Sequence, residues 1–303
     1  MAEKAISKIE VAEITPEIIA NEALGMLEAE LYLAKNVARD SEFTDATEGE
    51  TIKIAKRGTL TANQKTAKTN VTIQEPSFDK VSVSLDNHWE VTFRVEDIAR
   101  TLATGKIEID LGYITDAIQV LGEKIENALA AKYTEFSAHV IGDGTTDITD
   151  DFLLSARGNM TKARAPRTDR FLYADPDQLN AILKLDKFVS TDKYGSATPV
   201  QEGEFGRIYN MRVFESLFPQ TSGTSPVITH NIAMHRNALV LATRPLKKPM
   251  SKNVEVGYAE KDGIMFRVVM SYNANLLADQ ITIDTLWGVA GLRPEFGNDI
   301  RTK

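Results

Sequence analysis

The segment from Arg57 to Glu75 constrains this chain most; it reads RGTLTANQKTAKTNVTIQE. It has no apolar cluster that could anchor a core before Val71 and Ile73. Extended back to residue 53, it has no acidic residue before Glu75 and carries five basic ones: Lys53, Lys56, Arg57, Lys65 and Lys68. The chain as a whole is acidic, with a formal net charge of -8. We therefore expect this cationic segment to find its packing partner outside its own domain.

The flanks of this segment alternate between apolar and polar residues. Ile52 and Ile54 precede it, and Val71 and Ile73 resume the alternation. Further apolar residues follow on odd positions: Val81, Val83, Leu85, Trp89, Val91, Phe93 and Val95. Period-two patterning predicts strands with one wet face, so the cationic segment is predicted to be the far end of a long two-stranded hairpin. Loops of this length are usually functional or disordered. An acidic surface on another copy of the chain is the nearest candidate partner.

Composition excludes several classes of protein. The 303 residues and 43% hydrophobic content are enough for one large domain or two modest ones. The absence of cysteine excludes disulfide frameworks, thiolate metal sites and cysteine nucleophiles. The sequence has no signal-peptide pattern and no apolar run of membrane-spanning length, so we expect a soluble chain made in the cytoplasm. The acidic balance argues against tight general binding of nucleic acid.

Helical periodicity predicts two long helices. Thr15, Pro16 and Glu17 form a helix start, and apolar spacing extends that helix to about Arg39. A second helix is predicted from Asp110 to about Val140, which at ~1.5 Å per residue spans roughly 45 Å.

Shorter elements follow the loop GDGTTDITDD at 142–151, which is a predicted hinge. The pattern indicates a helix from about Phe152 to Arg164, a strand at 170–173, a helix at 176–185 and a strand at 211–214. Alternation returns at 264–272 and at Ile281 and Ile283. The predicted fold class is α+β, with a second domain at about 147–263.

The sequence contains no hydrolase-elbow, zinc-peptidase, phosphate-loop or dinucleotide-binding motif. His230 and His235 do not have helical metal-ligand spacing, and we expect both at a strand edge or in a loop. Serine, aspartate and histidine residues are too scattered to nominate a triad. The acidic loop is interpreted as a solvated turn that caps the next helix; its aspartates are Asp143, Asp147, Asp150 and Asp151. We therefore expect no catalytic residue, no metal and no cofactor.

A small basic cluster follows the predicted helix and contains Lys162, Arg164, Arg167 and Arg170. It could touch nucleic acid. However, no aromatic residues interleave with it and Asp169 interrupts it, so a solvated or intersubunit face is favoured.

The order of these elements resembles the major capsid protein of tailed bacteriophages, the Hong Kong 97-type fold. EGEFGRIYNMRVFES at 202–216 is similar to the family's G-x-x-G-x-I-x-G-x-x-V-x-x-S segment, with Asn210 where glycine is common. HRNALVLA at 235–242 resembles the strand that often follows, and residues 266–297 resemble the C-terminal sheet. GETIKIAKRG at 49–58 resembles the entry to the family's extended loop. The closest branch looks like the P-twenty-two-type coat proteins, without their inserted domain.

The resemblance implies a division of the chain. Residues 1–46 would be an N-terminal arm and 47–95 the extended hairpin loop with its flanking strands. Residues 96–146 would be a peripheral domain with its spine helix, and 147–263 an axial domain. Residues 264–303 would return to the peripheral sheet.

The function it implies is a structural shell protein, not an enzyme. Copies would form hexamers and pentamers of an icosahedral head around double-stranded DNA, in the virion, after synthesis in the host cytoplasm. The five basic loop residues would contact a neighbouring copy. The arm is too short to hold a scaffolding region, which implies a separate scaffolding protein, together with a portal protein and no membrane partner.

Two alternatives remain open. The chain could form a nanocompartment shell of the same fold around a protein cargo, or it could be a soluble enzyme of mixed fold. Some capsid relatives also crosslink a loop lysine to an asparagine. Lys65 or Lys68 with Asn273 or Asn275 could do so here, although neither pair aligns residue for residue.

Overall fold

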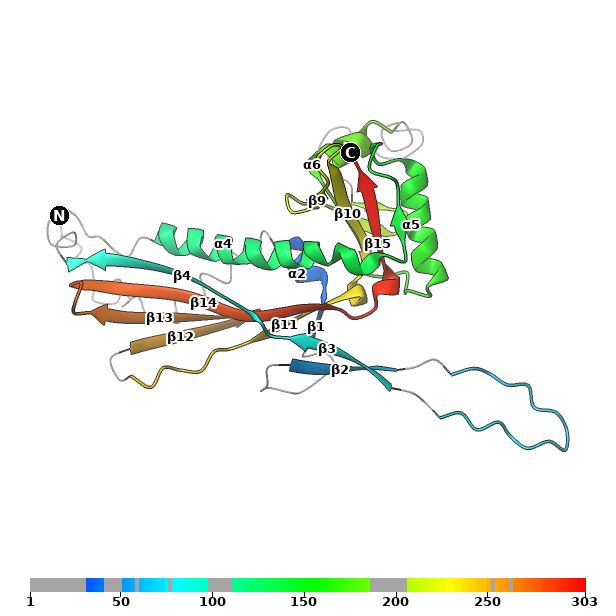
Figure 1. The fold of residues 1–303 in the computed structure, drawn as a ribbon, viewed down its shortest axis with the longest axis horizontal. Helices are drawn as coiled ribbons and strands as arrows, with labels where there is room; N and C mark the ends of the chain where they lie inside the picture. Colours follow the sequence, from blue (N-terminus) through cyan, green and yellow to red (C-terminus); the bar gives the residue numbers. More distant parts are fainter. Residues whose placement is uncertain are drawn as a thin grey trace, which may run out of the picture. The chain divides into compact units, whose positions relative to one another are not determined.

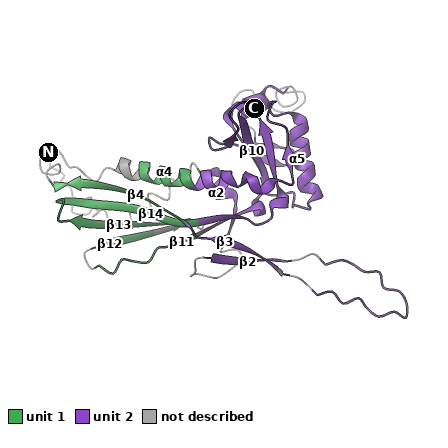
Figure 2. Ribbon diagram, in the orientation of Figure 1, with its two compact units in different colours: residues 1–31, 87–124, 243–287 green, residues 32–86, 125–242, 288–303 purple. Residues whose placement is uncertain are grey.

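A computed structural model gives the fold, and it describes residues 31–40, 51–57, 60–75, 78–97, 111–185, 206–251, 254–261 and 264–303. The chain divides into two compact units (Figure 2). Unit 1 comprises residues 1–31, 87–124 and 243–287, and unit 2 comprises 32–86, 125–242 and 288–303. Helices and strands are mixed along the chain, so the predicted α+β class is confirmed.

Unit 1 is built on antiparallel strands that follow one another in the order β12 (Val254–Lys261), β13 (Ile264–Asn273), β14 (Ala278–Gly291) and β4 (Asn87–Glu96) (Figure 1). The last residues of β14, from Gly288 on, belong to unit 2. The alternation predicted for β13 is confirmed, because Ile264, Phe266 and Val268 are buried on one face. Arg267 donates from both Nε and Nη2 to the carboxyl of Asp284 on β14, at 3.0 and 2.5 Å.

The apolar run from Val81 to Val95 is two strands rather than one. β3 (Phe78–Ser84) pairs with β2 (Thr51–Arg57), whereas β4 pairs with β14. Val83 and Leu85 are buried, but no residue of β4 is, and Trp89 is largely exposed. The apolar residues do alternate along both strands, but β3 and β4 pair with different partner strands.

The long helix is shorter than predicted. α4 (Leu111–Ala130) has 20 residues, or about 30 Å at 1.5 Å per residue, and the chain continues as the 3-10 helix η2 (Ala131–Phe136). The expected continuation to Val140 is wrong because β5 (Val140–Ile141) pairs in parallel with β15 (Gly297–Thr302). The carbonyl of His139 accepts the N–H of Asp299 at 3.0 Å, so the sheet takes hydrogen bonds that a longer helix would use.

Unit 2 contains a seven-stranded sheet in the order β5, β15, β10 (Ile228–His235), β6 (Arg170–Ala174), β8 (Met211–Glu215) and β7 (Arg207–Ile208). The remaining strand, β9 (Gln220–Ser222), pairs with β10. All five residues of β6 are buried, which confirms the strand predicted at 170–173. The helices of this unit are α5 (Asp150–Lys162) and α6 (Pro176–Leu183).

Capping residues set the starts of both helices. α5 begins two residues before the predicted Phe152, because the Thr149 side chain accepts the N–H of Phe152 at 3.4 Å. Asp175 caps α6 and accepts the N–H of Asp177 at 3.1 Å, with Pro176 at the first helical position.

The first predicted helix is only partly described, since residues 15–30 lie outside the described ranges. In the described part, α2 (Tyr32–Asn36) ends three residues before the predicted Arg39. It ends there because β1 (Ala38–Arg39) pairs in parallel with β11 (Leu239–Arg244), which follows the 3-10 helix η3 (Arg236–Ala238). The acidic, turn-rich residues 41–50 predict a connector, and residues 96–102 predict a short helical turn. The connector, and the turn beyond residue 97, lie outside the described residues.

Candidate functional site

The cationic segment projects from the strand pair β2–β3. The base of this hairpin is packed, since Ile52, Ile54 and Val83 are buried, and pairing ends where Arg57 faces Phe78. Beyond it, residues 60–75 form neither helix nor strand, and Figure 1 shows them as a loop that leaves the ends of β2 and β3. The expected return to a strand at Val71 and Ile73 is therefore wrong. Their side chains are 69% and 86% exposed.

Polar contacts of its own hold this loop in shape. The N–H of Thr61 donates to Gln74 Oε1 at 2.9 Å, and Gln74 Nε2 donates back to the Thr61 carbonyl. Lys65 Nζ donates to the carbonyls of Thr66 and Thr69, in a turn where Lys68 has a positive φ of 66°. The loop has a defined conformation without a core.

Exposed apolar side chains accompany the basic ones. Leu60 is 67% exposed, which joins it to Val71 and Ile73 on the same loop. The interpretation from sequence treated the loop as cationic and overlooked Leu60. Clustered apolar exposure on a segment without a core is typical of a surface that another molecule covers.

The five predicted basic residues do not lie together in one site. Lys53 is exposed on β2, Arg57 ends that strand, and Lys65 and Lys68 lie in the loop. Lys56 is half-buried and forms an ion pair with Glu295 of the same chain at 3.1 Å, beside the 3-10 helix η4 (Pro294–Phe296). Lys56 therefore anchors the hairpin base to its own unit.

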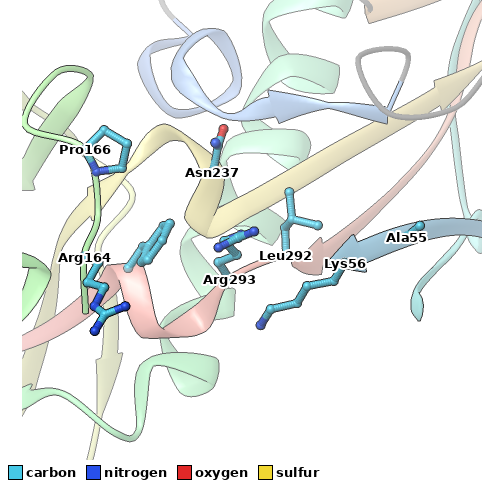
Figure 3. A pocket seen from close by; sticks show the side chains of 8 residues that line it. Ala55, Lys56, Arg164, Pro166, Asn237, Leu292 and Arg293 are labelled. Carbon is cyan, nitrogen blue, oxygen red and sulfur yellow. The ribbon is translucent and has the colours of Figure 1, made fainter. Parts of the chain in front are cut away.

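A half-open pocket of about 310 Å³ lies at this base, within unit 2 (Figure 3). Three cations contribute to its wall, and the Arg293 guanidinium lies 5.4 Å from the centre of the Phe296 ring. The N–H groups of Leu292 and Arg293 both donate to the Ala238 carbonyl, at 2.9 and 3.1 Å. The lining residues are Ala55, Lys56, Arg164, Pro166, Asn237, Leu292, Arg293 and Phe296.

A serine, a histidine and an aspartate do come together in the seven-stranded sheet. His230 Nδ1 is 2.8 Å from Asp299 Oδ1, and its Nε2 is 2.8 Å from Ser222 Oγ. Asp299 Oδ2 also accepts from Arg301 Nε at 2.9 Å. The sequence-based statement that such residues are too scattered is wrong, because pairing of β10 with β9 and β15 joins positions 8 and 69 residues apart.

These residues tie three strands together. His230 and Asp299 are both buried, and the imidazole stacks on the Tyr133 ring at 3.9 Å between centroids. The expectation of strand-edge or loop histidines is wrong for His230, which lies inside the sheet, and His235 is buried as well. Burial lowers the pKa of His235, whose Nδ1 accepts the N–H of Asn237 at 3.1 Å.

The acidic loop is the helix-capping turn that its sequence predicts. Asp143 Oδ1 accepts from both the hydroxyl and the N–H of Thr145, at 2.7 and 3.0 Å, and these bonds lower the pKa of Asp143. Within the described ranges, no group of three or more histidine, cysteine or acidic residues is placed to hold a metal ion. In the same part of the chain, no helix is long and apolar enough to cross a membrane.

No family model matches the chain, and no curated protein matches it. Solved structures do match it over almost its whole length. A chain from Mycobacterium phage Che8 has a TM-score of 0.69 at 20% identity, over 89% of this chain and 91% of that one. The capsid of the cyanophage P-SCSP1u has a TM-score of 0.64 at 12% identity, over 91% of this chain and 88% of that one. The mature capsid of bacteriophage PhiM1 has a TM-score of 0.61 at 15% identity, over 90% of this chain and 87% of that one.

Proposed function

We propose that this chain, which has the Hong Kong 97-type fold of the phage capsid chains it matches, is a major capsid protein. Its copies would form hexamers and pentamers of an icosahedral head around double-stranded DNA. The observation that carries this proposal is the loop at 60–75, which is exposed, has a defined conformation and has no core of its own. In a closed shell such a loop lies over a neighbouring copy, which supplies the missing core.

Apolar burial would provide most of the contact energy. Full burial of an aliphatic side chain stabilises by roughly 1.5–3 kcal/mol, and Leu60, Val71 and Ile73 are available for it. Charge pairs at exposed sites contribute less and mainly set register, which is the role we assign to Lys53, Arg57, Lys65 and Lys68. Lys56, paired with Glu295, keeps the hairpin base in place. Many weak contacts of this kind add up in a closed shell.

The same proposal covers the parts of the chain and its partners. Residues 1–46 form the arm, 47–95 the extended loop with its strands, and 96–146 the peripheral domain. Residues 147–263 form the axial domain, except that β12 pairs with β13 in the other sheet. Residues 264–303 return to the peripheral sheet, except that β15 pairs with β10. The protein is non-enzymatic, acts with a separate scaffolding protein and a portal protein, and belongs to the P-twenty-two-type branch. It is made in the host cytoplasm and resides in the virion.

Negative-stain electron microscopy tests the proposal. The wild-type chain and a deletion of Thr59 to Asn70 are expressed with the other head proteins of the virus, and circular dichroism checks that both fold. We expect closed shells containing DNA from the wild type alone. Shells that enclose a protein cargo instead would indicate a nanocompartment. Equal shells from both chains would contradict the role of the loop, and a folded wild type that never assembles would contradict the capsid function.

A further inference from the structure

A second pocket, of about 320 Å³, lies in unit 2 beside β6, β7 and β8. It is lined by four arginines and a single carboxyl group, in an otherwise acidic protein. The lining residues are Arg167, Thr168, Asp169, Arg170, Arg207, Asn210 and Arg212.

The hairpin β7–β8 places two of these arginines side by side. Arg207 lies directly opposite Arg212, while the next pair, Ile208 and Met211, is buried. Tyr209 and Asn210 form the two-residue turn with φ of 48° and 67°, the left-handed backbone that tight hairpins require. The alternation of the strands therefore turns both guanidinium groups outward on the same face. Like charges directly opposite each other destabilise a strand pair unless something lies between them.

Arg170 adds a buried positive charge that pairs with no carboxyl group among the described residues. Its side chain is 2% exposed and donates to the carbonyls of Pro166 and Ala165 at 2.7 and 2.8 Å, and to Thr161 Oγ1 at 3.2 Å. Desolvation, and then the charges of Arg157 and Arg167, lower the pKa of Arg170. The positive potential of the cluster thus reaches into the protein.

Within the described part of the chain, no carboxyl group pairs with Arg167, Arg207 or Arg212. Asp169 is the one acidic side chain of the lining, and it has a left-handed φ of 53°. Glu202 and Glu204 precede Arg207 in the sequence but lie outside the described residues. The pocket is therefore a concave surface with a net positive charge.

We propose that this pocket binds a phosphate group. Guanidinium forks match phosphate geometry with paired N–H···O bonds, and a phosphate has enough oxygens to engage several forks at once. A phosphate between Arg207 and Arg212 would also relieve the repulsion of that opposed pair. The phosphate could be a free ion, a nucleotide or the backbone of a nucleic acid. The proposal holds whether or not the chain forms a shell.

Isothermal titration of the full chain with inorganic phosphate, at constant ionic strength, tests this site. We expect saturable binding that Arg212→Gln weakens by about tenfold, the cost of one charge-assisted contact, and that Arg207→Gln with Arg212→Gln abolishes. The matched control is Arg94→Gln on β4, which loses the same charge at an exposed arginine hydrogen-bonded to Gln280 and should bind like the wild type. Because Arg207 and Arg212 are exposed, we also expect Arg212→Gln to unfold no earlier than the wild type in phosphate-free buffer.

Competition experiments identify the source of the phosphate and the outcomes that overturn the site. Displacement by a duplex oligonucleotide would assign it to a nucleic-acid backbone, and phosphate binding without displacement would assign it to a free ion or nucleotide. If Arg94→Gln weakens phosphate binding as much as Arg212→Gln does, the loss reflects the overall charge of the protein, and the proposal is overturned. If succinate binds as tightly as phosphate, the pocket is a carboxylate site for an acidic protein surface, and the phosphate proposal is overturned. The absence of phosphate binding would overturn it as well.

Discussion

Glu126 of α4 accepts a hydrogen bond at 3.2 Å from the backbone N–H of Ala34, which lies 92 residues earlier in the chain. The Glu126 side chain is buried, and desolvation raises its pKa to about 8, against the lowering effects of two backbone hydrogen bonds and of Arg39. Tyr173 faces the same group, and burial raises its pKa well above 10. One titratable carboxyl group therefore fastens α2 to α4.

This arrangement predicts that stability depends on pH. Between pH 4.5 and about 8 the unfolded chain binds fewer protons at Glu126 than the folded chain does, so the free energy of unfolding falls as pH rises. The slope approaches ~1.4 kcal/mol per pH unit and flattens above about pH 8. Glu126→Gln keeps an acceptor for Ala34 and should remove this part of the slope. Urea unfolding from pH 5 to 9 measures it, with Asp116→Asn on the exposed side of α4 as the control. Parallel curves for wild type and Glu126→Gln would contradict the prediction.

The apolar side chains of the loop should control assembly rather than folding. Val71→Asp with Ile73→Asp places two charges where a neighbouring copy is expected to supply a core, so we expect few or no shells at an unchanged unfolding midpoint. Thr72→Asp, at the exposed position between them, adds one charge and should assemble nearly normally. Sedimentation velocity and electron microscopy report the outcome, and full assembly of the double variant would rule out an apolar contact.

The basic side chains of the loop should matter for register. Lys65→Glu with Lys68→Glu reverses two charges at exposed positions and should lower the yield of correctly sized shells while the monomer stays folded. Lys65→Arg with Lys68→Arg keeps the charges and should restore the yield. Particle counts and diameters from electron microscopy compare the two, and normal shells from the glutamate variant would count against the loop contact.

The tie between Asp299 and His230 should contribute strongly to the stability of unit 2. Asp299→Ala leaves the buried His230 and the partly exposed Arg301 without their shared acceptor, and we expect the free energy of unfolding to fall by roughly 2–3 kcal/mol. Ser222→Ala removes only the hydrogen bond between Ser222 Oγ and His230 Nε2 and should lower the free energy of unfolding by about 1 kcal/mol. Denaturant unfolding measures both changes, and a larger loss for Ser222→Ala would reverse the assigned order of importance.

Two glycines of the second unit should respond oppositely to alanine. A Cβ at Gly297 would lie 2.2 Å from Phe136 Cε1, closer than packed atoms can approach, so Gly297→Ala should destabilise by roughly 1–3 kcal/mol. A Cβ at Gly158 of α5 meets nothing within 4 Å, so Gly158→Ala should stabilise by about 0.5–1 kcal/mol. Thermal unfolding of both variants checks the pair, and a shift of the same sign in both would show that the space around these positions is not decisive.

Local chemistry made several elements predictable from sequence. Strand β6, helix α6 and the alternation of β13 follow from residues adjacent in the chain, as does the turn in which Asp143 accepts from Thr145. The place of the projecting loop was predictable as well, because a cationic segment without acidic residues, between two alternating runs, cannot form a core. The exposure of Leu60 was not predictable, because a single apolar residue in a polar segment gives no periodic signal.

Other features depend on partners far along the chain. The helical run stops short of Val140 because β5 pairs with β15. Val71 and Ile73 are exposed because no strand in the described part of the chain pairs with them. His230 meets Asp299, and Arg207 meets Arg212, only through strand pairing. The sequence by itself determined the fold class, most strands and the place of the projecting loop, since these depend on periodicity and turn residues. The tertiary structure alone decided where elements end and which polar groups meet, since these depend on hydrogen bonds between distant residues.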